Sequence, residues 1–323
     1  MTSDIFIFND NLRQLLEKYK ICTDRHSLFN NRIANGNKIL VTKDIRLEPY
    51  TGIYVGNTFC SMGAFSYSRS RLYANYKIGR YCSLADNIGL IGVRHPYERV
   101  TSSVFTFQNL EIIGPGFKKA IHDLSNNSVH SSIELQEEHN GDAPIYIGHD
   151  VWIGEGVVLK PGIKIGQGAV IAQKSIVTHD VPPYSIWGGV PAKLIKMRFT
   201  DSVIEKIMKS EWWNYAFPHF SSLNTLDPIG FCEALEELKV TGLEKFEPNT
   251  LTFNDIVCCQ KEYIRTIESI ARARMLSDRH KILRRVIKLM VGKNRYKQLK
   301  MDPDGFFNNS RNSIIKILGR FYN

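Results

Sequence analysis

The most constraining feature of this chain is an aliphatic residue that recurs at every sixth position. The series comprises Ile147, Ile153, Leu159, Ile165, Ile171 and Val177. A period of six fits neither a helix nor a single strand, whose side chains repeat about every 3.6 and 2 residues. It fits a short strand followed by a corner, with three such sides closing one triangular coil. The sequence therefore predicts a mainly β protein built around a parallel β-helix.

The residues around this series carry the same period. A small residue usually follows the aliphatic one, as at Gly148, Gly154 and Gly166, and we expect it to let the backbone turn at the corner. Four positions after each aliphatic residue comes another small or branched one. These residues are Val151, Val157, Ile163, Ala169, Ser175 and Val181. Six uninterrupted repeats predict two full coils.

The repeat extends upstream and is then interrupted. Ile78, Leu84 and Leu90 keep the spacing and predict one more coil, with Leu72 six positions before them. Further upstream, Val55-Gly56 and Met62-Gly63 read as degenerate repeats. Between His95 and Ile147 the pattern lapses. A gap of this length inside a solenoid predicts an excursion loop, at 95–144, and loops of that size usually have a function.

Helical patterns flank the repeats. Residues 9–20 predict a short amphipathic helix, and Thr200 or Asp201 could cap another one that starts near residue 200. A further helix is expected at 228–239, and a basic one from 260 to about 291. We therefore divide the chain into four parts. They are an N-terminal helix and lead-in (1–45), the β-helix (46–199), a helical extension (200–259) and a basic helical tail (260–323).

Nearly all of the net charge of +10 belongs to the tail. Residues 260–323 contain 16 Lys and Arg against 5 Asp and Glu, which leaves the rest of the chain at −1. Such a segment could lie on an anionic membrane surface, bind an anionic polymer or bind a partner. Nucleic acid is not expected, because no recognition motif accompanies the charge.

Composition restricts the setting of the protein. No run of about 18 apolar residues predicts a membrane span, and the first residues lack the pattern of a secretory signal. The six cysteines are scattered and suggest neither a zinc site nor a disulfide framework. We expect a cytoplasmic, metal-free protein, with the basic tail allowing peripheral attachment to an inner membrane.

Several segments resemble one family, the hexapeptide-repeat acyltransferases, and in particular their xenobiotic acetyltransferase branch. That branch also contains many O-acetyltransferases of bacterial surface sugars. The segments are 63–67 (GAFSY), 78–85 (IGRYCSLA), His95-Pro96, 150–154 (DVWIG), 188–193 (GGVPAK) and Trp212-Trp213. The resemblance covers roughly residues 45–225. It implies a left-handed parallel β-helix, acetyl-CoA as cosubstrate, and a homotrimer with its sites at the subunit interfaces.

The tail has a resemblance of its own. Residues 299–311 (LKMDPDGFFNNSR) are similar to a C-terminal motif of many capsular-polysaccharide biosynthesis proteins, from which Met301 and Asn309 depart.

His95 is the predicted catalytic base. Acetyl transfer to a hydroxyl needs a base for the hydroxyl proton. A histidine suits this task because an ordinary imidazole is largely neutral at pH 7. His95 stands where the repeat stops and the loop begins, and the His-Pro of the family corresponds to it. Direct attack on the thioester needs no nucleophile, and Cys82 is expected to face the core. His149 is expected at a corner of the solenoid surface.

The resemblance also implies which residues bind the two substrates. Those expected to line the CoA groove are Trp152, Glu155, Gln173, Thr178, His179, Lys193 and Lys196, with Lys193 the best candidate for a phosphate contact. Those expected to meet the acceptor are Tyr97, Ser102, Ser103, Phe105 and Phe107, because a sugar needs an apolar face and hydrogen-bonding groups.

The basic tail and its capsule-like motif favour one acceptor. We expect an O-acetyltransferase for a hydroxyl of a capsular or O-antigen polysaccharide. Two alternatives stay open, a small-molecule (antibiotic or xenobiotic) acetyltransferase of the same fold and a non-enzymatic solenoid scaffold.

Overall fold

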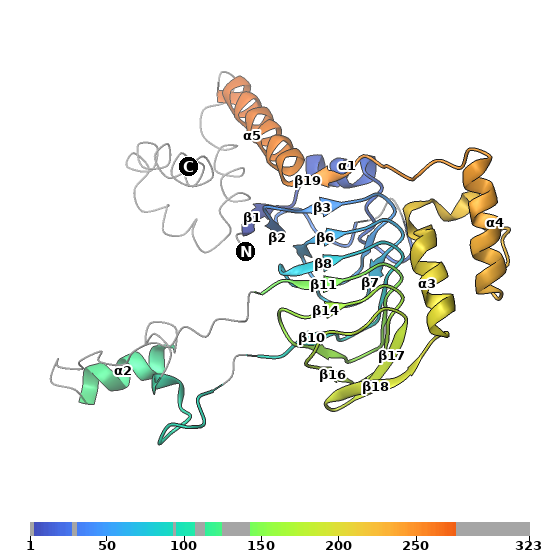
Figure 1. The fold of residues 1–323 in the computed structure, drawn as a ribbon. Coiled ribbons are helices and arrows are strands. Elements are labelled where there is room, and N and C mark those ends of the chain that lie inside the picture. Colours follow the sequence, from blue (N-terminus) through green and yellow to red (C-terminus); the bar gives the residue numbers. More distant parts are fainter. Residues whose placement is uncertain (1–2, 28–30, 93–94, 107–113, 125–142, 276–323) are drawn as a thin grey trace.

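The computed structural model describes residues 3–27, 31–92, 95–106, 114–124 and 143–275. Most of these residues form a parallel β-solenoid, with helices at one end and along one side (Figure 1). The predicted helix from 260 to 291 falls partly outside the described residues, and the segment 276–323 lies wholly outside them.

Three ladders of short strands form the sides of the solenoid. The first contains β3 (Arg46–Leu47), β6 (Ser61–Met62), β8 (Tyr76–Ile78), β11 (Ile145–Ile147) and β14 (Lys164–Ile165). The second contains β4 (Gly52–Ile53), β7 (Tyr67–Ser68), β9 (Ser83–Leu84), β12 (Trp152–Ile153), β15 (Val170–Ile171) and β17 (Ser185–Gly189). The third contains β10 (Gly89–Leu90), β13 (Val158–Leu159) and β16 (Ile176–Val177). Within each ladder the neighbouring strands are parallel.

The six-residue series forms the core, as predicted. Ile153, Leu159 and Val177 are completely buried, and Ile147, Ile165 and Ile171 are nearly so. Because strands in one ladder pair in register, residues of the series stack directly on one another, as Ile153 does between Leu84 and Ile171. The solenoid interior is therefore a continuous apolar column that is shared by all coils.

The upstream register differs from the prediction. Val55 is 43% exposed, whereas the buried residues are Leu47, Ile53 and Phe59, again six apart. Val55 follows β4 instead of belonging to it, so the Val55-Gly56 repeat was wrong, while Met62 is buried as expected. The solenoid also starts earlier than residue 46. β2 (Lys38–Thr42) already pairs in parallel with β5 (Thr58–Phe59).

The small residue at the corner has a different role from the expected one. A Cβ at Gly79 would lie 2.6 Å from the carbonyl oxygen of Gly148, and one at Gly166 would lie 2.5 Å from the nitrogen of Pro183. The positive φ angle falls two residues later, as at Tyr81 (63°). The glycine is therefore needed because adjacent coils approach closely at that point.

Helices and one antiparallel strand cap the N-terminal end of the solenoid. β1 (Ser3–Ile7) runs antiparallel to β2, and α1 (Asp10–Lys18) follows, with the Asn9 side chain accepting the N–H of Leu12 as the N-cap. The helix predicted at 9–20 is thus confirmed. α5 (Phe253–Met275) packs beside α1 after β19 (Leu251–Thr252), which pairs with β3. α5 begins seven residues earlier than predicted.

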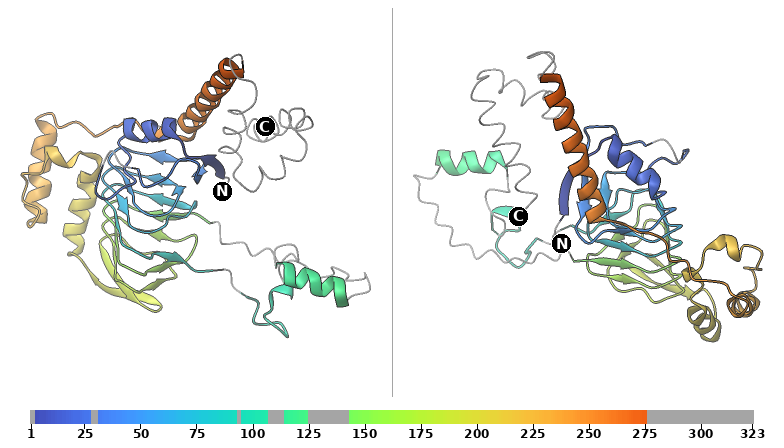
Figure 2. Two further views of the ribbon diagram at one scale, coloured as in Figure 1. Left: turned by 180° about the vertical axis from the view of Figure 1, so that it is seen from behind. Right: turned by 90° about the horizontal axis from the view of Figure 1, so that it is seen from above.

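The excursion loop leaves the solenoid after β10 and returns at β11. Its described parts contain η1 (Val104–Thr106) and α2 (Pro115–Leu124), a helix that the sequence did not predict. In Figure 1 and in the left view of Figure 2, α2 lies well away from the solenoid and from the other helices.

The helical extension covers one corner of the solenoid. β18 (Ala192–Met197) first folds back antiparallel on β17. Then follow α3 (Asp201–Ser210) with Thr200 at its N-cap, η3 (Trp212–Asn214), η4 (Phe217–His219) and α4 (Pro228–Val240). The predicted helices near 200 and at 228–239 are both confirmed. In the described residues, no helix combines the length and the apolar character that a membrane span requires.

Candidate active site

His95 lies at the root of the excursion loop, five residues after β10, with an exposed side chain. Its Nδ1 is 2.7 Å from the carbonyl oxygen of Ser102. A carbonyl oxygen only accepts hydrogen bonds, so Nδ1 must carry the proton of the neutral ring. The lone pair of the neutral imidazole is then at Nε2. This tautomer is the one that a base acting through Nε2 requires.

The predicted acceptor residues follow His95 closely in the sequence. Tyr97 is 77% exposed, Ser102 is exposed and Ser103 is half-buried. Ser102 contacts His95 through its backbone carbonyl. Phe105 belongs to η1, but its side chain lies outside the described part of the chain, as does Phe107 altogether.

Three of the predicted cofactor residues share one outward face of the second ladder. Trp152 pairs with Val170, Val170 with Ile186, and Ile186 with Lys196, so the four side chains form one row across the sheet. Three strand spacings separate Trp152 from Lys196, about 14 Å. Lys193 lies opposite Gly188, two residues from Ile186, and therefore on the same face. Trp152 is 57% exposed, and both lysines are exposed.

Glu155 and Gln173 lie on adjacent coils at the corner that follows this row, where a Cβ at Gly154 would lie 2.6 Å from the backbone nitrogen of Gln173. The Glu155 carbonyl accepts the backbone N–H of Lys174 at 2.8 Å, and the Glu155 carboxylate lies 3.1 Å from the Lys174 ammonium. The side chains of Glu155 and Lys174 are both largely exposed, so this ion pair contributes little to the stability of the fold. Lys174 nevertheless offsets the negative charge that Glu155 would present to a phosphate.

Thr178 and His179 lie elsewhere, just after β16 in the third ladder. The Thr178 Oγ1 and the His179 Nδ1 are 2.9 Å apart. His95 also follows a strand of this ladder, β10, whereas Trp152, Lys193 and Lys196 belong to the second ladder. The predicted residues therefore form two groups on two sides of the solenoid.

Cys82 is not a nucleophile. Its thiol is completely buried and donates to the carbonyl of Gly148 at 3.0 Å. Burial raises the pKa of Cys82 to about 12, so the reactive thiolate is not formed near neutral pH. Cys82 thus faces the core, as expected. Among the described residues, no group of three or more His, Cys, Asp or Glu side chains could hold a metal ion.

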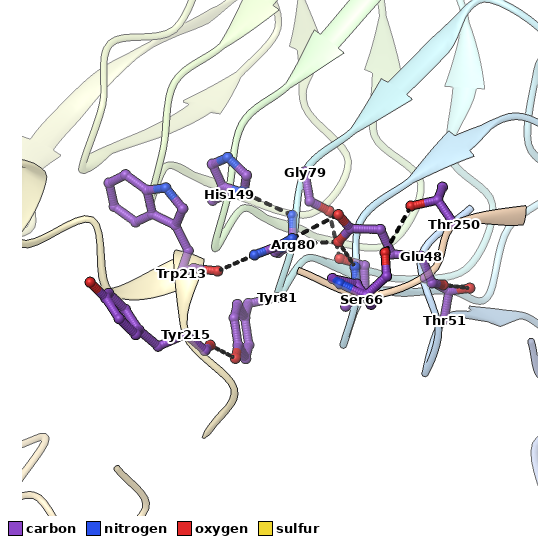
Figure 3. A network of polar contacts seen from close by, with 12 residues as sticks. Glu48, Thr51, Ser66, Gly79, Arg80, Tyr81, His149, Trp213, Tyr215 and Thr250 are labelled. Atoms are coloured by element: carbon purple, nitrogen blue, oxygen red, sulfur yellow. Dashed lines mark hydrogen bonds and ion pairs between the residues drawn. The ribbon is translucent and has the colours of Figure 1, made fainter. Parts of the chain in front are cut away.

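A polar network that sequence reasoning missed joins the solenoid to the helical extension (Figure 3). Nε and Nη2 of Arg80 donate to the two carboxylate oxygens of Glu48, at 2.6 and 2.8 Å. Nη1 of Arg80 donates to the carbonyl of Trp213 at 3.3 Å, and its backbone N–H donates to Nδ1 of His149 at 2.9 Å. The His149 ring stacks on Trp213 with 5.3 Å between ring centroids. Arg80 thus links three segments that lie far apart in the chain.

The ionisable groups of this network have shifted pKa values. Burial lowers the pKa of His149 to about 4, and the positive charge of Arg80 acts in the same direction. Burial would raise the pKa of Glu48, but hydrogen bonds from Arg80 and from the backbone N–H of Ala64 prevail and lower it. His149 is therefore neutral at pH 7, and Glu48 is ionised. His149 lies at a corner as expected, but it is stacked on Trp213 of the extension instead of lying open on the surface.

The residues of the second ladder fit an acetyl-CoA arm. Trp152, Val170 and Ile186 offer an apolar row for the pantetheine chain, and two exposed lysines at the end of that row can meet phosphates. Acetyl-CoA bound there would supply the activated acetyl group through its thioester.

Comparison with known proteins identifies the family. The pattern described as "Bacterial transferase hexapeptide (six repeats)" matches residues 144–179. A probable macrolide acetyltransferase of Lysinibacillus sphaericus is 41% identical over 141 residues, which cover 43% of this chain and 69% of the relative. Chloramphenicol acetyltransferases of Klebsiella aerogenes and Morganella morganii are each 35% identical. The matches cover 58% and 68% of this chain and 81% and 91% of those relatives. The chain therefore belongs to the xenobiotic acetyltransferase branch of the hexapeptide-repeat acyltransferases, enzymes that use acetyl-CoA.

Proposed function

We propose that this enzyme transfers acetyl from acetyl-CoA directly to a hydroxyl of a small, antibiotic-like molecule, with His95 as the general base. The observation that carries the assignment of the base is the 2.7 Å contact between His95 Nδ1 and the Ser102 carbonyl. A neutral ring that donates from Nδ1 has its lone pair at Nε2.

His95 would act twice in one turnover. Its Nε2 accepts the proton of the acceptor hydroxyl while the hydroxyl oxygen attacks the thioester carbonyl carbon. The same nitrogen then returns the proton to the departing sulfur, so the products are an acetyl ester and free CoA. The bond to Ser102 keeps the ring oriented through both transfers, and the imidazolium formed between them keeps that bond because Nδ1 stays protonated.

The proposed cofactor site combines the two groups of predicted residues. Trp152, Lys193 and Lys196 would bind the pantetheine arm and the phosphates of CoA, with Glu155 and Gln173 nearby. Thr178 and His179 would complete the site from a neighbouring subunit. The proposal includes a homotrimer, in which a groove between two subunits would bring the second ladder of one against the third ladder of the other.

The relatives favour a small acceptor over the polysaccharide that the sequence suggested. Those compared above are named for a macrolide and for chloramphenicol, and the matches cover 43%, 58% and 68% of this chain. Tyr97, Ser102, Ser103 and Phe105 would then line the acceptor site. A surface polysaccharide is the second candidate. The basic segment 260–323 and its capsule-like motif favour it, together with peripheral attachment to a membrane.

The test is a thiol-release assay with acetyl-CoA and three acceptors, namely chloramphenicol, a macrolide and a purified capsular polysaccharide. We expect release with a small acceptor, and a His95→Ala variant slower by about 10²- to 10⁴-fold. His219→Ala is the matched control, since His219 is exposed in η4 on the extension. Unchanged kcat in His95→Ala would refute the assignment of the base, and release with the polysaccharide alone would favour the second candidate.

A further inference from the structure

The loop segment 95–106 contains a chain of hydrogen bonds that ends on His95. The peptide group between Ser102 and Ser103 is its centre, because a peptide unit is planar and its C=O and N–H move together. The C=O of this unit accepts from His95, and the N–H donates to Thr101 Oγ1 at 3.2 Å. The orientation of one peptide plane therefore sets the orientation of the imidazole.

The next carbonyl along the chain is also held. The Ser103 carbonyl accepts the backbone N–H of Thr106 at 3.0 Å and the Thr106 hydroxyl at 2.8 Å. These two bonds close the turn that contains η1. The Thr106 carbonyl in turn accepts Nη1 of Arg99. Arg99 is half-buried and belongs to the irregular segment between His95 and the turn.

We propose that Arg99 is a positioning residue for His95: its guanidinium ties the 101–106 turn to the chain that carries the histidine, and thereby holds the Ser102 carbonyl against Nδ1. This inference rests on the proposed role of His95 as base. Arg99 does not touch the reacting atoms. It acts through the turn, because a loop without this cross-link can rotate the Ser102–Ser103 peptide and release the ring.

Two consequences distinguish positioning from general support of the loop. First, loss of the Ser102 contact removes the reason for the proton to stay on Nδ1, so the neutral ring redistributes its proton between the two nitrogens. Second, misplacement of a catalytic group by about 1 Å can cost about 10²-fold in rate without weakening the binding of the cosubstrate. Arg99→Ala should therefore lower kcat by about 10- to 100-fold and leave the KM for acetyl-CoA unchanged.

The experiment compares Arg99→Ala, Arg99→Lys and the control Arg265→Ala, which removes an exposed arginine from α5. Steady-state kinetics give kcat and KM for each variant, with and without added guanidinium at millimolar concentration. Nitrogen-15 NMR of histidine-labelled protein gives the tautomer of His95, whose signal is assigned with His95→Gln. We expect the Nδ1–H tautomer in the unmodified protein and in Arg265→Ala, a mixture in Arg99→Ala, partial retention in Arg99→Lys, and recovery of kcat in Arg99→Ala with guanidinium.

The possible failures separate the two proposals. Unchanged kcat in Arg99→Ala, or a reduced kcat with the Nδ1–H tautomer intact, would overturn the positioning role. Full activity in His95→Gln would instead overturn the role of His95 as base, while the tautomer of His95 in Arg99→Ala would still report whether Arg99 orients the ring.

Discussion

His149 makes the stability of the folded chain depend on pH in a predictable window. Its pKa of about 4 in the folded state lies below the ordinary histidine value of about 6.5 expected in the unfolded chain. The unfolded state therefore binds more protons between these two values, and stability falls as the pH decreases from about 6.5 to about 4. Above this window both states are neutral at this residue and the effect is absent. Linkage gives a loss of about 2 kcal/mol per chain between pH 8 and pH 5.

The perturbation is His149→Asn, which removes the titration while an amide oxygen can still accept the Arg80 N–H. Urea unfolding at one fixed protein concentration, at pH 8 and at pH 5, measures the free energy of unfolding of both proteins. We expect the unmodified protein to lose about 2 kcal/mol more than the variant. His219→Asn, at an exposed site on the same extension, should behave like the unmodified protein. Equal losses in the unmodified protein and in His149→Asn would refute the reasoning.

Two further predictions use matched pairs of residues. Glu48→Gln should cost about 2 kcal/mol in urea unfolding at pH 8, because it leaves the guanidinium of Arg80 without its charged partner. Glu155→Gln breaks a largely exposed pair and should cost less than about 1 kcal/mol, so equal costs would contradict the difference in burial. Trp152→Ala should raise the KM for acetyl-CoA about tenfold, because one favourable contact with the cosubstrate is lost. The free energy of unfolding should not decrease. Tyr146→Ala, which removes a 47% exposed aromatic from the first ladder, is its control, and a similar rise in KM there would argue against a cofactor role for Trp152.

The solenoid could be predicted from the sequence because its core is a periodic function of residue number. Every coil places an aliphatic side chain inward after six residues, so the pattern is local and repeats enough times to be recognised. The prediction was wrong at Val55 because the pattern does not repeat often enough there to fix its register. With one degenerate coil and no uninterrupted neighbours, the register through Leu47, Ile53 and Phe59 has no more local support than a register that is displaced by two residues.

The network around Arg80 could not be predicted, because its partners have no common spacing. Glu48, His149 and Trp213 lie 32, 69 and 133 residues away from Arg80. They meet because successive coils stack a corner residue of one turn on that of the next, and because the helical extension folds back over this corner. The sequence could, by contrast, single out His95 as the proposed base, because this residue stands where the repeat stops.

The excursion loop allows a backbone contact to His95 that depends on the chain leaving the solenoid. A residue on a solenoid strand points either into the packed column or out from a flat ladder. Leaving the solenoid after β10 frees the chain to form the 95–106 turn, in which the Ser102 carbonyl reaches back to Nδ1. The proposed base therefore lies on an irregular segment, where hydrogen bonds within the loop take the place of the ladder in holding the side chain. Activity should accordingly be more sensitive to loss of those few bonds than to substitutions on the exposed faces of the coils.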